Sequence, residues 1–284
     1  MIEILVCGGL VLLAAACGTS KAGMDTKGGA LAEGEERQLR LYLPEASGTL
    51  VFEGEGITID ASNASEGYIM VKSEPGERKL KLRLACGDKS YGYDLPSDGH
   101  YIAVPCQMGS GEYLVRVMEH VKDDLYAQLF AQELEVTIPI PERPFLYASQ
   151  YVNFDALSAV VAESNQLAAG LKADDAIVQK LYHFVVSHTV YDYEKAATVE
   201  QGYLPNPDET LESGKGICFD YSALLAAMLR AQGIPTKLVV GVVMPEGITH
   251  AWNQAYIDGQ WVWMDATFDN KEHVETDYIL ERVY

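Results

Sequence analysis

Three residues of this 284-residue chain have types and a spacing that could perform nucleophilic chemistry: Cys218, His250 and Asp265. Cys218 follows Gly216 and opens an Ala- and Leu-rich stretch that predicts a buried helix over 218–231. A helix N-terminus favours a thiolate over a thiol, and its backbone N–H groups can receive the negative oxygen of a tetrahedral intermediate. The pattern therefore indicates a cysteine nucleophile with an oxyanion-binding site beside it.

The other two residues could supply a base and the group that orients it. His250 begins one predicted strand and Asp265 lies near the end of the next, with a turn at Asp258-Gly259 between them. A hairpin would place the two side chains side by side, so that the carboxylate fixes the tautomer of a proton-transferring histidine. The spacing alone leaves another interpretation open, because a buried cysteine, a core histidine and an aspartate after a strand often occur together without forming a catalytic site.

The elements around these residues predict an α+β domain over 149–284. The apolar spacing predicts helices before Cys218 and strands after it: 153–171 and 174–188 as helices, and 236–244, 250–257 and 260–266 as strands. Between the second helix and Cys218, residues 196–216 read as a polar loop. The tail over 269–284 has no assigned role.

Residues 38–141 have the period of half-buried strands, because Leu80, Leu82 and Leu84 alternate with charged residues. Several short strands at such intervals predict a small all-β, sandwich-like domain. It contains no catalytic constellation, so it could be a spacer, a recognition module or a structural support. Prolines at 139, 141 and 144 mark its end.

The N-terminus predicts export. Residues 4–16 form an apolar run about as long as a signal-peptide core and shorter than the ~20 residues that span a bilayer. The run closes in small residues on Cys17, which resembles a bacterial lipoprotein processing site. We therefore expect a signal peptide over 1–16, a lipid on Cys17 that anchors the protein to the cell membrane, and a flexible linker over 17–37. The alternative is ordinary secretion, or a short apolar N-terminus without lipid.

The formal charge of −20 and a pI near 4.6 argue against sequence-independent binding to nucleic acid, because such binding needs clustered Lys and Arg. The acidic residues are dispersed and form no calcium-binding loop of the EF-hand kind, so no metal or other cofactor is expected. Outside the cytosol, Cys86 and Cys106 could form a disulfide, or they could be two buried free thiols.

Two stretches carry a family resemblance: Gly216-Ile217-Cys218-Phe219-Asp220-Tyr221, continuing to Pro235, and His250-Ala251-Trp252-Asn253, continuing to Thr267. They resemble the nucleophile helix and the His and Asp strands of the transglutaminase-like superfamily, and the resemblance extends over roughly 149–269. It implies a papain-like α+β fold with Cys218, His250 and Asp265 as a catalytic triad. Tyr191 and Trp252 would then line the active cleft or, alternatively, pack in the core.

The resemblance also implies acyl transfer through a thioester on Cys218. If water resolves the acyl-enzyme, the protein is a cysteine protease or amidase acting on a peptide, protein or cell-wall peptide. This activity is slightly favoured, because cleavage needs no second specific site. If an amine resolves it, the protein is a crosslinking transglutaminase. A surface lipoprotein that binds a peptide or partner without catalysis is the third reading.

Overall fold

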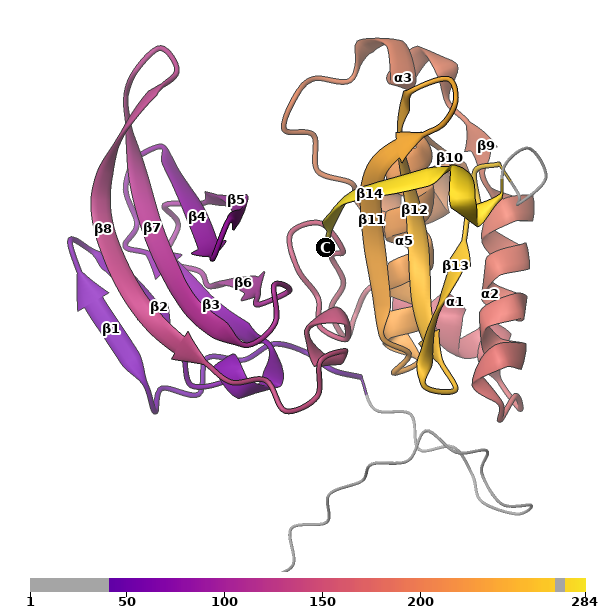
Figure 1. The fold of residues 1–284 in the computed structure, drawn as a ribbon, viewed down its shortest axis with the longest axis horizontal. Helices are drawn as coiled ribbons and strands as arrows, with labels where there is room; N and C mark the ends of the chain where they lie inside the picture. Colours follow the sequence, from indigo (N-terminus) through magenta and orange to yellow (C-terminus); the bar gives the residue numbers. More distant parts are fainter. Residues whose placement is uncertain (1–40, 269–273) are drawn as a thin grey trace, which may run out of the picture.

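The computed structural model describes residues 41–268 and 274–284, which form a β domain beside a domain of helices and one main sheet (Figure 1). The predicted α+β fold is therefore confirmed. The predicted signal peptide over 1–16, the lipid on Cys17 and the linker over 17–37 lie outside the described residues. None of the helices in the described ranges combines the length and apolar character needed to cross a bilayer.

The β domain is built from two four-stranded antiparallel sheets (Figure 1). One has the order β1-β2-β3-β6: Val51–Gly54, Ile57–Asp60, Tyr68–Ser73 and Ile102–Pro105. The other has the order β5-β4-β7-β8: Lys89–Leu95, Leu80–Cys86, Gly111–Lys122 and Leu125–Val136. In β4, Leu80, Leu82 and Leu84 are buried while Lys81 and Arg83 are exposed, so the period-two pattern faces the core between the sheets.

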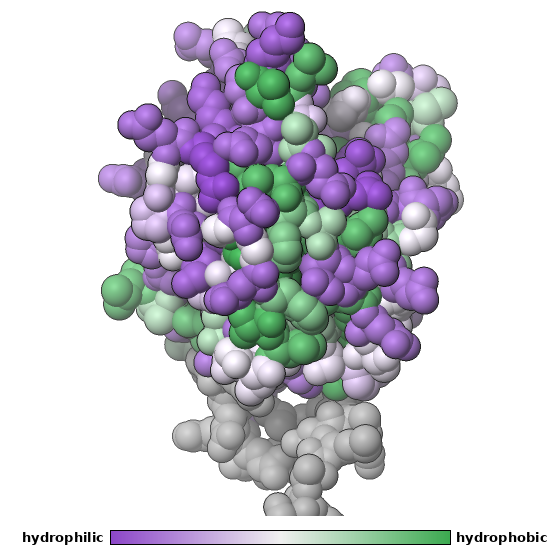
Figure 2. Space-filling view, turned by 90° about the vertical axis from the view of Figure 1, so that its left-hand side faces the viewer, coloured by the Kyte–Doolittle hydropathy of each residue, from purple (hydrophilic) through white to green (hydrophobic). Residues whose placement is uncertain are grey.

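The side of this sandwich that faces away from the helices carries a band of apolar side chains bordered by hydrophilic ones (Figure 2). The strands on that side are β1 and β8 (Figure 1), and Val51 and Leu125 are among the exposed hydrophobic residues. A Cβ on Gly54 would lie 2.4 Å from the Phe130 ring, so the two strand edges pack closely together there.

The disulfide considered for Cys86 and Cys106 does not form, and both thiols are free. Cys106 is 1% exposed within the sandwich, where burial raises the pKa of its thiol to about 12. Cys86 ends β4 opposite Tyr113 and lies against Gly111, at the margin of the sheet. Each cysteine therefore packs as a small apolar side chain.

The C-terminal domain surrounds one buried helix. α5 (Cys218–Ala231) contacts α1 (Ala159–Ala168), α2 (Asp174–His188) and α4 (Pro207–Ser213) as well as the sheet. The sheet has the order β13-β12-β11-β14: Gln260–Met264, Ile248–Ile257, Thr236–Val243 and Tyr278–Val283. The remaining elements are α3 (Tyr193–Thr198), a parallel pair β9 (Val190–Tyr191) and β10 (Lys215–Gly216), and three 3₁₀ turns at Ala64–Glu66, Arg143–Phe145 and Glu275–Asp277.

Three stretches differ from the sequence-based prediction. The helix expected over 153–171 is shorter, Ala159–Ala168, because Asp155 accepts the N–H of Leu157 in a turn that precedes the helix. The expected loop over 196–216 contains α4, which Asn206 caps by accepting the N–H groups of Asp208 and Glu209, with Pro207 at its first position. Gly214 ends α4 with a left-handed φ of 61°. The unassigned tail contributes β14, which pairs with β11 and completes the sheet.

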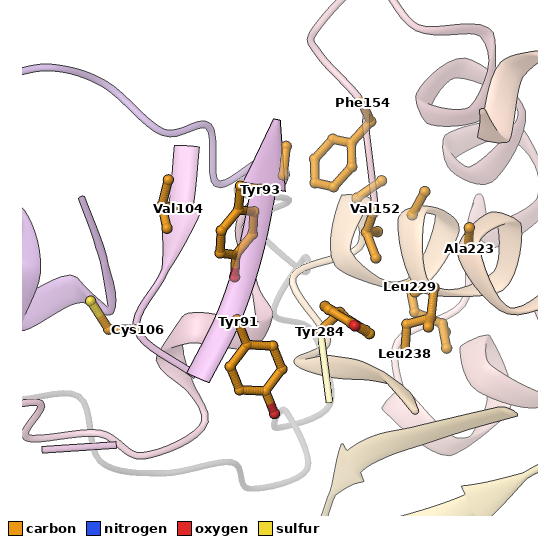
Figure 3. Close-up of a cluster of buried hydrophobic side chains, with 14 of the residues drawn as sticks. Tyr91, Tyr93, Val104, Cys106, Val152, Phe154, Ala223, Leu229, Leu238 and Tyr284 are labelled. Atoms are coloured by element: carbon orange, nitrogen blue, oxygen red, sulfur yellow. The ribbon is translucent and has the colours of Figure 1, made fainter. Parts of the chain in front are cut away.

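The two domains share a continuous core. Figure 3 shows Tyr91 and Tyr93 of β5 facing Val152, Phe154 and Tyr284. Arg230 of α5 is fully buried at this junction. Its guanidinium donates to three backbone carbonyls, those of Tyr147, Thr236 and Tyr284, at 2.7 to 2.9 Å. The buried helix is thereby tied to the segment between the domains and to the last strand.

Candidate active site

Cys218 is the first residue of α5 and is half-buried. The Asp220 carboxylate accepts the N–H of Ile217 at 2.8 Å, which fixes the turn into the helix. Helix geometry leaves the N–H groups of Cys218 and Phe219 without an intrahelical acceptor. A Cβ on Gly216 would lie 2.5 Å from the Asp220 Cβ, so only glycine fits before this turn. The thiol therefore lies at a helix N-terminus, beside backbone N–H groups that have no acceptor within the helix.

His250 and Asp265 come together from the β12–β13 hairpin. The turn at Asp258 and Gly259 has φ values of 50° and 81°, and the ladder runs from Ile257–Gln260 to Asn253–Met264. Asp265 follows the last paired residue and reaches diagonally to His250, whose Nε2–H donates to Asp265 Oδ2 at 2.7 Å. The imidazole is 3% exposed and the carboxylate is fully buried, so water does not weaken this contact.

The His250 ring also lies within hydrogen-bonding reach of Cys218. Because Nε2 is engaged by Asp265, Nδ1 is the nitrogen that faces the thiol. Burial disfavours the imidazolium, but the hydrogen bonds and negative charges of Asp265 and Cys218 outweigh it and raise the pKa of His250 to about 9. Phe268 stacks on the ring with 4.5 Å between centroids, which holds its orientation.

Asp265 is held by more donors than His250 alone. Its Oδ1 accepts the N–H groups of Thr267 and Phe268 at 2.9 and 3.2 Å, and its Oδ2 also accepts the Tyr278 hydroxyl at 2.6 Å. Burial would raise the pKa of the carboxyl, but the hydrogen bonds and the charge of His250 lower it below its usual value. Asp265 is therefore an ionised, immobile partner for the imidazole.

Tyr278 is a site residue that the sequence did not indicate. It begins β14, 13 positions beyond Asp265 in a tail of mixed polarity, and burial with the nearby Asp265 raises the pKa of its phenol. Its ring also packs edge-on against Trp252 at 5.0 Å. The sequence held one general signal for such a residue. The chain has 17 tyrosines, and the hydroxyl of a partly buried tyrosine normally has a hydrogen-bond partner.

A second network, also missed from the sequence, lies two residues beyond Cys218. Asp220 is fully buried and accepts from Lys195 Nζ at 2.7 Å and from the Tyr203 hydroxyl at 2.6 Å. Lys195 Nζ also donates to the Tyr203 oxygen at 2.6 Å. The segment from α3 to Tyr203 is therefore tied to the first turn of α5.

The two residues predicted as cleft-lining or core have different surroundings. Tyr191 is partly exposed and packs edge-on against Tyr193 at 5.0 Å, and its burial together with the nearby charge of Cys218 raises the pKa of its phenol. Trp252 is 2% exposed and stacks on the side of His250, so it belongs to the core and does not line an open cleft. Its place in the middle of the four-stranded sheet, between β11 and β13, explains this burial.

Within 41–268 and 274–284, no group of three or more His, Cys, Asp or Glu side chains could hold a metal ion. Cys218, His250 and Asp265 bring a thiol, an imidazole and a carboxylate together, and these are the groups that acyl transfer to a thiol uses.

Comparison with known proteins bears on this arrangement. Residues 162–266 match the family model of the transglutaminase-like superfamily, a range that includes Cys218, His250 and Asp265. Human kyphoscoliosis peptidase is 26% identical over 137 residues, which is 45% of this chain and 20% of that protein. The chain thus spans about a fifth of the length of that curated relative.

Among solved structures, a candidate cysteine protease from Cytophaga hutchinsonii is similar with a TM-score of 0.44 and 14% identity, covering 76% of this chain and 83% of that one. Red sea bream transglutaminase is similar with a TM-score of 0.30 and 13% identity, covering 72% of this chain and 48% of that one. The match thus assigns residues 162–266, the part of the chain that contains Cys218, His250 and Asp265, to the transglutaminase-like superfamily.

Proposed function

We propose that this protein is an extracytoplasmic cysteine protease or amidase that cleaves amide bonds in peptide or cell-envelope substrates through a thioester on Cys218. The observation that carries the proposal is the hydrogen-bonded set of Cys218, His250 and Asp265 at the N-terminus of α5. The relative named as a peptidase supports the same reaction type.

In the proposed acylation, Cys218 Sγ attacks the amide carbonyl carbon, and the carbonyl oxygen takes up the negative charge. The N–H groups of Cys218 and Phe219, in the first turn of α5, donate to that oxygen. The imidazolium of His250 gives its Nδ1 proton to the departing nitrogen as the C–N bond breaks. The products of this half-reaction are a free amine and a thioester.

In the proposed deacylation, water attacks the thioester carbonyl and gives a proton to the now neutral His250. The C–S bond then breaks, which releases the carboxylic acid and restores the thiolate–imidazolium pair. Asp265 stays ionised throughout, because its role is to hold Nε2–H and to stabilise the charge on the ring. If an amine replaces water, the same residues catalyse crosslinking.

The test is mass spectrometry of glutamine-containing peptides incubated with the purified protein, with and without a primary amine, beside the Cys218→Ala variant. We expect cleavage or deamidation that depends on Cys218. Amine incorporation would assign crosslinking instead. An absence of any change in the peptides, together with no acyl-enzyme, would leave a binding protein.

The cellular location is part of the proposal and rests on the apolar run over 4–16 and on Cys17. A lipid on Cys17 would hold the enzyme at the outer surface of the cell membrane. In a cell fractionation, the intact protein should sediment with membranes and the Cys17→Ala variant should not. A variant that remains in the membrane fraction would refute the lipid anchor.

A further inference from the structure

A cavity of about 670 Å³ lies apart from Cys218, where three segments of the chain meet. Its walls come from the β domain at 43–44, 70 and 101–103, from the interdomain segment 148–155, and from residues 204–209 that lead into α4. This volume is in the range of sites that bind a ligand or part of a polypeptide.

One wall of the cavity is the edge strand β6, which pairs with β3 and with no other strand among the described residues. Cys106 N–H donates to Gly67 O at 2.7 Å, and the pairing continues in the same register through β6. Hydrogen-bonded pairs alternate with non-bonded pairs in an antiparallel ladder. The N–H and C=O of Ala103 therefore point away from β3, toward the open edge. Pro105 is the next outward-facing position and has no N–H to offer.

The edge strand of the other sheet on this side of the β domain, β5, differs from β6 because its outward-facing backbone groups already have hydrogen-bond partners. β5 is covered by the interdomain segment: Asp94 N–H donates to Gln150 Oε1 at 2.8 Å, Gln150 Nε2 donates to Asp94 O at 2.9 Å, and the Tyr151 hydroxyl donates to Gly92 O at 2.8 Å. No such contact to Ala103 occurs among the described residues; instead, Ala103 lines the cavity. The unpaired position of β6 is thus the one that a ligand can reach.

The side chains of the cavity indicate what that ligand is. Met70, Phe154 and Leu204 supply apolar walls. Among the described residues of the lining, the charged ones are Asp155 and Glu209, and none is Lys, Arg or His. An unpaired strand edge binds the backbone of an extended peptide. An apolar wall favours a hydrophobic side chain in that peptide, and the two carboxylates favour a basic residue next to it.

We infer that this cavity binds an extended basic segment of the peptide substrate, added as a strand at Ala103 of β6; the inference rests on the proposed function. Leu204 follows Tyr203, whose hydroxyl donates to Asp220 two residues beyond Cys218. A peptide in the cavity therefore contacts the segment that is tied to the nucleophile helix.

The test is fluorescence anisotropy with the Cys218→Ala protein and a labelled peptide, Gly-Ser-Lys-Leu-Arg-Val-Ser-Gly, beside its counterpart with Glu in place of Lys and Arg. We expect the basic peptide to bind at least tenfold more tightly than the acidic one. Ala103→Pro removes an N–H that β3 does not use, which an edge strand tolerates, and it should weaken binding at least tenfold, whereas Ala103→Ser should not. Asp155→Asn combined with Glu209→Gln should reduce the preference for the basic peptide to threefold or less.

Equal binding of the two peptides, or undiminished binding by a folded Ala103→Pro variant, would overturn the inference. If Ala103→Pro does not fold, hydrogen exchange of the Ala103 amide decides: protection by the basic peptide supports the site, and unchanged exchange rejects it. Binding is measured without turnover, so failure of the proposed function would show separately as an absence of Cys218-dependent cleavage.

Discussion

The two domains differ in what they bury. The sandwich core is almost entirely apolar, and its few buried polar residues include Asp60, Ser73 and Gln107. The C-terminal domain buries two carboxylates, an imidazole and a guanidinium: Asp220, Asp265, His250 and Arg230. A buried charge is costly unless it is paired and hydrogen-bonded, and each of these groups is held by two or more partners. The difference indicates that packing specifies the sandwich, whereas a buried polar network also specifies the second domain.

The strongest test of this difference is to remove the nucleophile. Cys218→Ala should abolish all cleavage and all covalent labelling while leaving the thermal unfolding temperature nearly unchanged, because the thiol is half-buried and its loss leaves no cavity in the core. Peptide mass spectrometry and calorimetry measure the two effects. The matched change in the sandwich, Cys86→Ala, should leave activity intact; residual Cys218-independent cleavage would contradict the mechanism.

Next in size is the loss of the orienting charge. Asp265→Asn should slow acylation by roughly 10²–10⁴ with the fold preserved, because a neutral amide neither fixes the imidazole tautomer nor stabilises the imidazolium. Single-turnover kinetics with an ester or amide substrate gives the rate. An unchanged rate would mean that another group orients His250.

The stability of the polar network can be probed away from the reaction. Arg230→Met leaves three buried carbonyls without their donor, and we expect it to lower the free energy of unfolding by about 2–4 kcal/mol. Arg83→Met, on the exposed face of β4, should change it by less than about 0.5 kcal/mol. Urea unfolding of both variants makes the comparison, and equal effects would show that Arg230 is not a structural tie.

The pH dependence of stability should report on His250. Its folded-state pKa of about 9 lies above its ordinary value of 6.5, so the stabilisation is fully present below pH 6.5 and is lost as the pH rises through about 9. The loss is up to about 3 kcal/mol. Urea midpoints at pH 6 and pH 9.5 should therefore diverge in the wild type, and the divergence should shrink in His250→Gln. A variant with the same pH dependence as the wild type would assign it to other groups.

The smallest expected effect is that of Tyr278→Phe. It removes one of the donors to Asp265 and should lower kcat about three- to tenfold with little change in KM. Because the Tyr278 hydroxyl and His250 Nε2–H share Oδ2, loss of the hydroxyl leaves more of the carboxylate charge for the imidazolium, and the alkaline limb of the kcat/KM profile should move to higher pH. A Tyr256→Phe control, elsewhere in the same sheet, should leave the profile unchanged.

The sequence predicts the parts of the site that lie within one element or one hairpin. Cys218 at a helix start, and His250 with Asp265 across a two-strand turn, are visible because their spacing is short and their flanking turn residues are diagnostic. The contacts of Lys195, Tyr203 and Tyr278 are not visible, because they join segments whose approach depends on the packing of the whole domain.

The same reasoning applies outside the site, to the loop predicted over 196–216 and to the two alternatives left open for Cys86 and Cys106. The stretch over 196–216 is polar, yet Asn206, Pro207 and Gly214 supply local signals for a short helix there that composition alone obscures. The disulfide between Cys86 and Cys106 was suggested by their sharing one strand-rich segment, but whether two thiols meet depends on which way each Cβ points, and this is fixed only in the folded sheets.

Arg230 has a consequence for how the protein unfolds. Its guanidinium donates to carbonyls of the interdomain segment, of the start of β11 and of the residue after β14. Across the same junction, the ring centroids of Tyr91 and Tyr284 are 5.5 Å apart. The nucleophile helix thus cannot lose its surroundings in one domain without exposing the core of the other. The described residues should accordingly melt in a single cooperative transition, with a calorimetric enthalpy that matches the van't Hoff enthalpy. The sandwich would then act as part of the folding unit that keeps Cys218 in place.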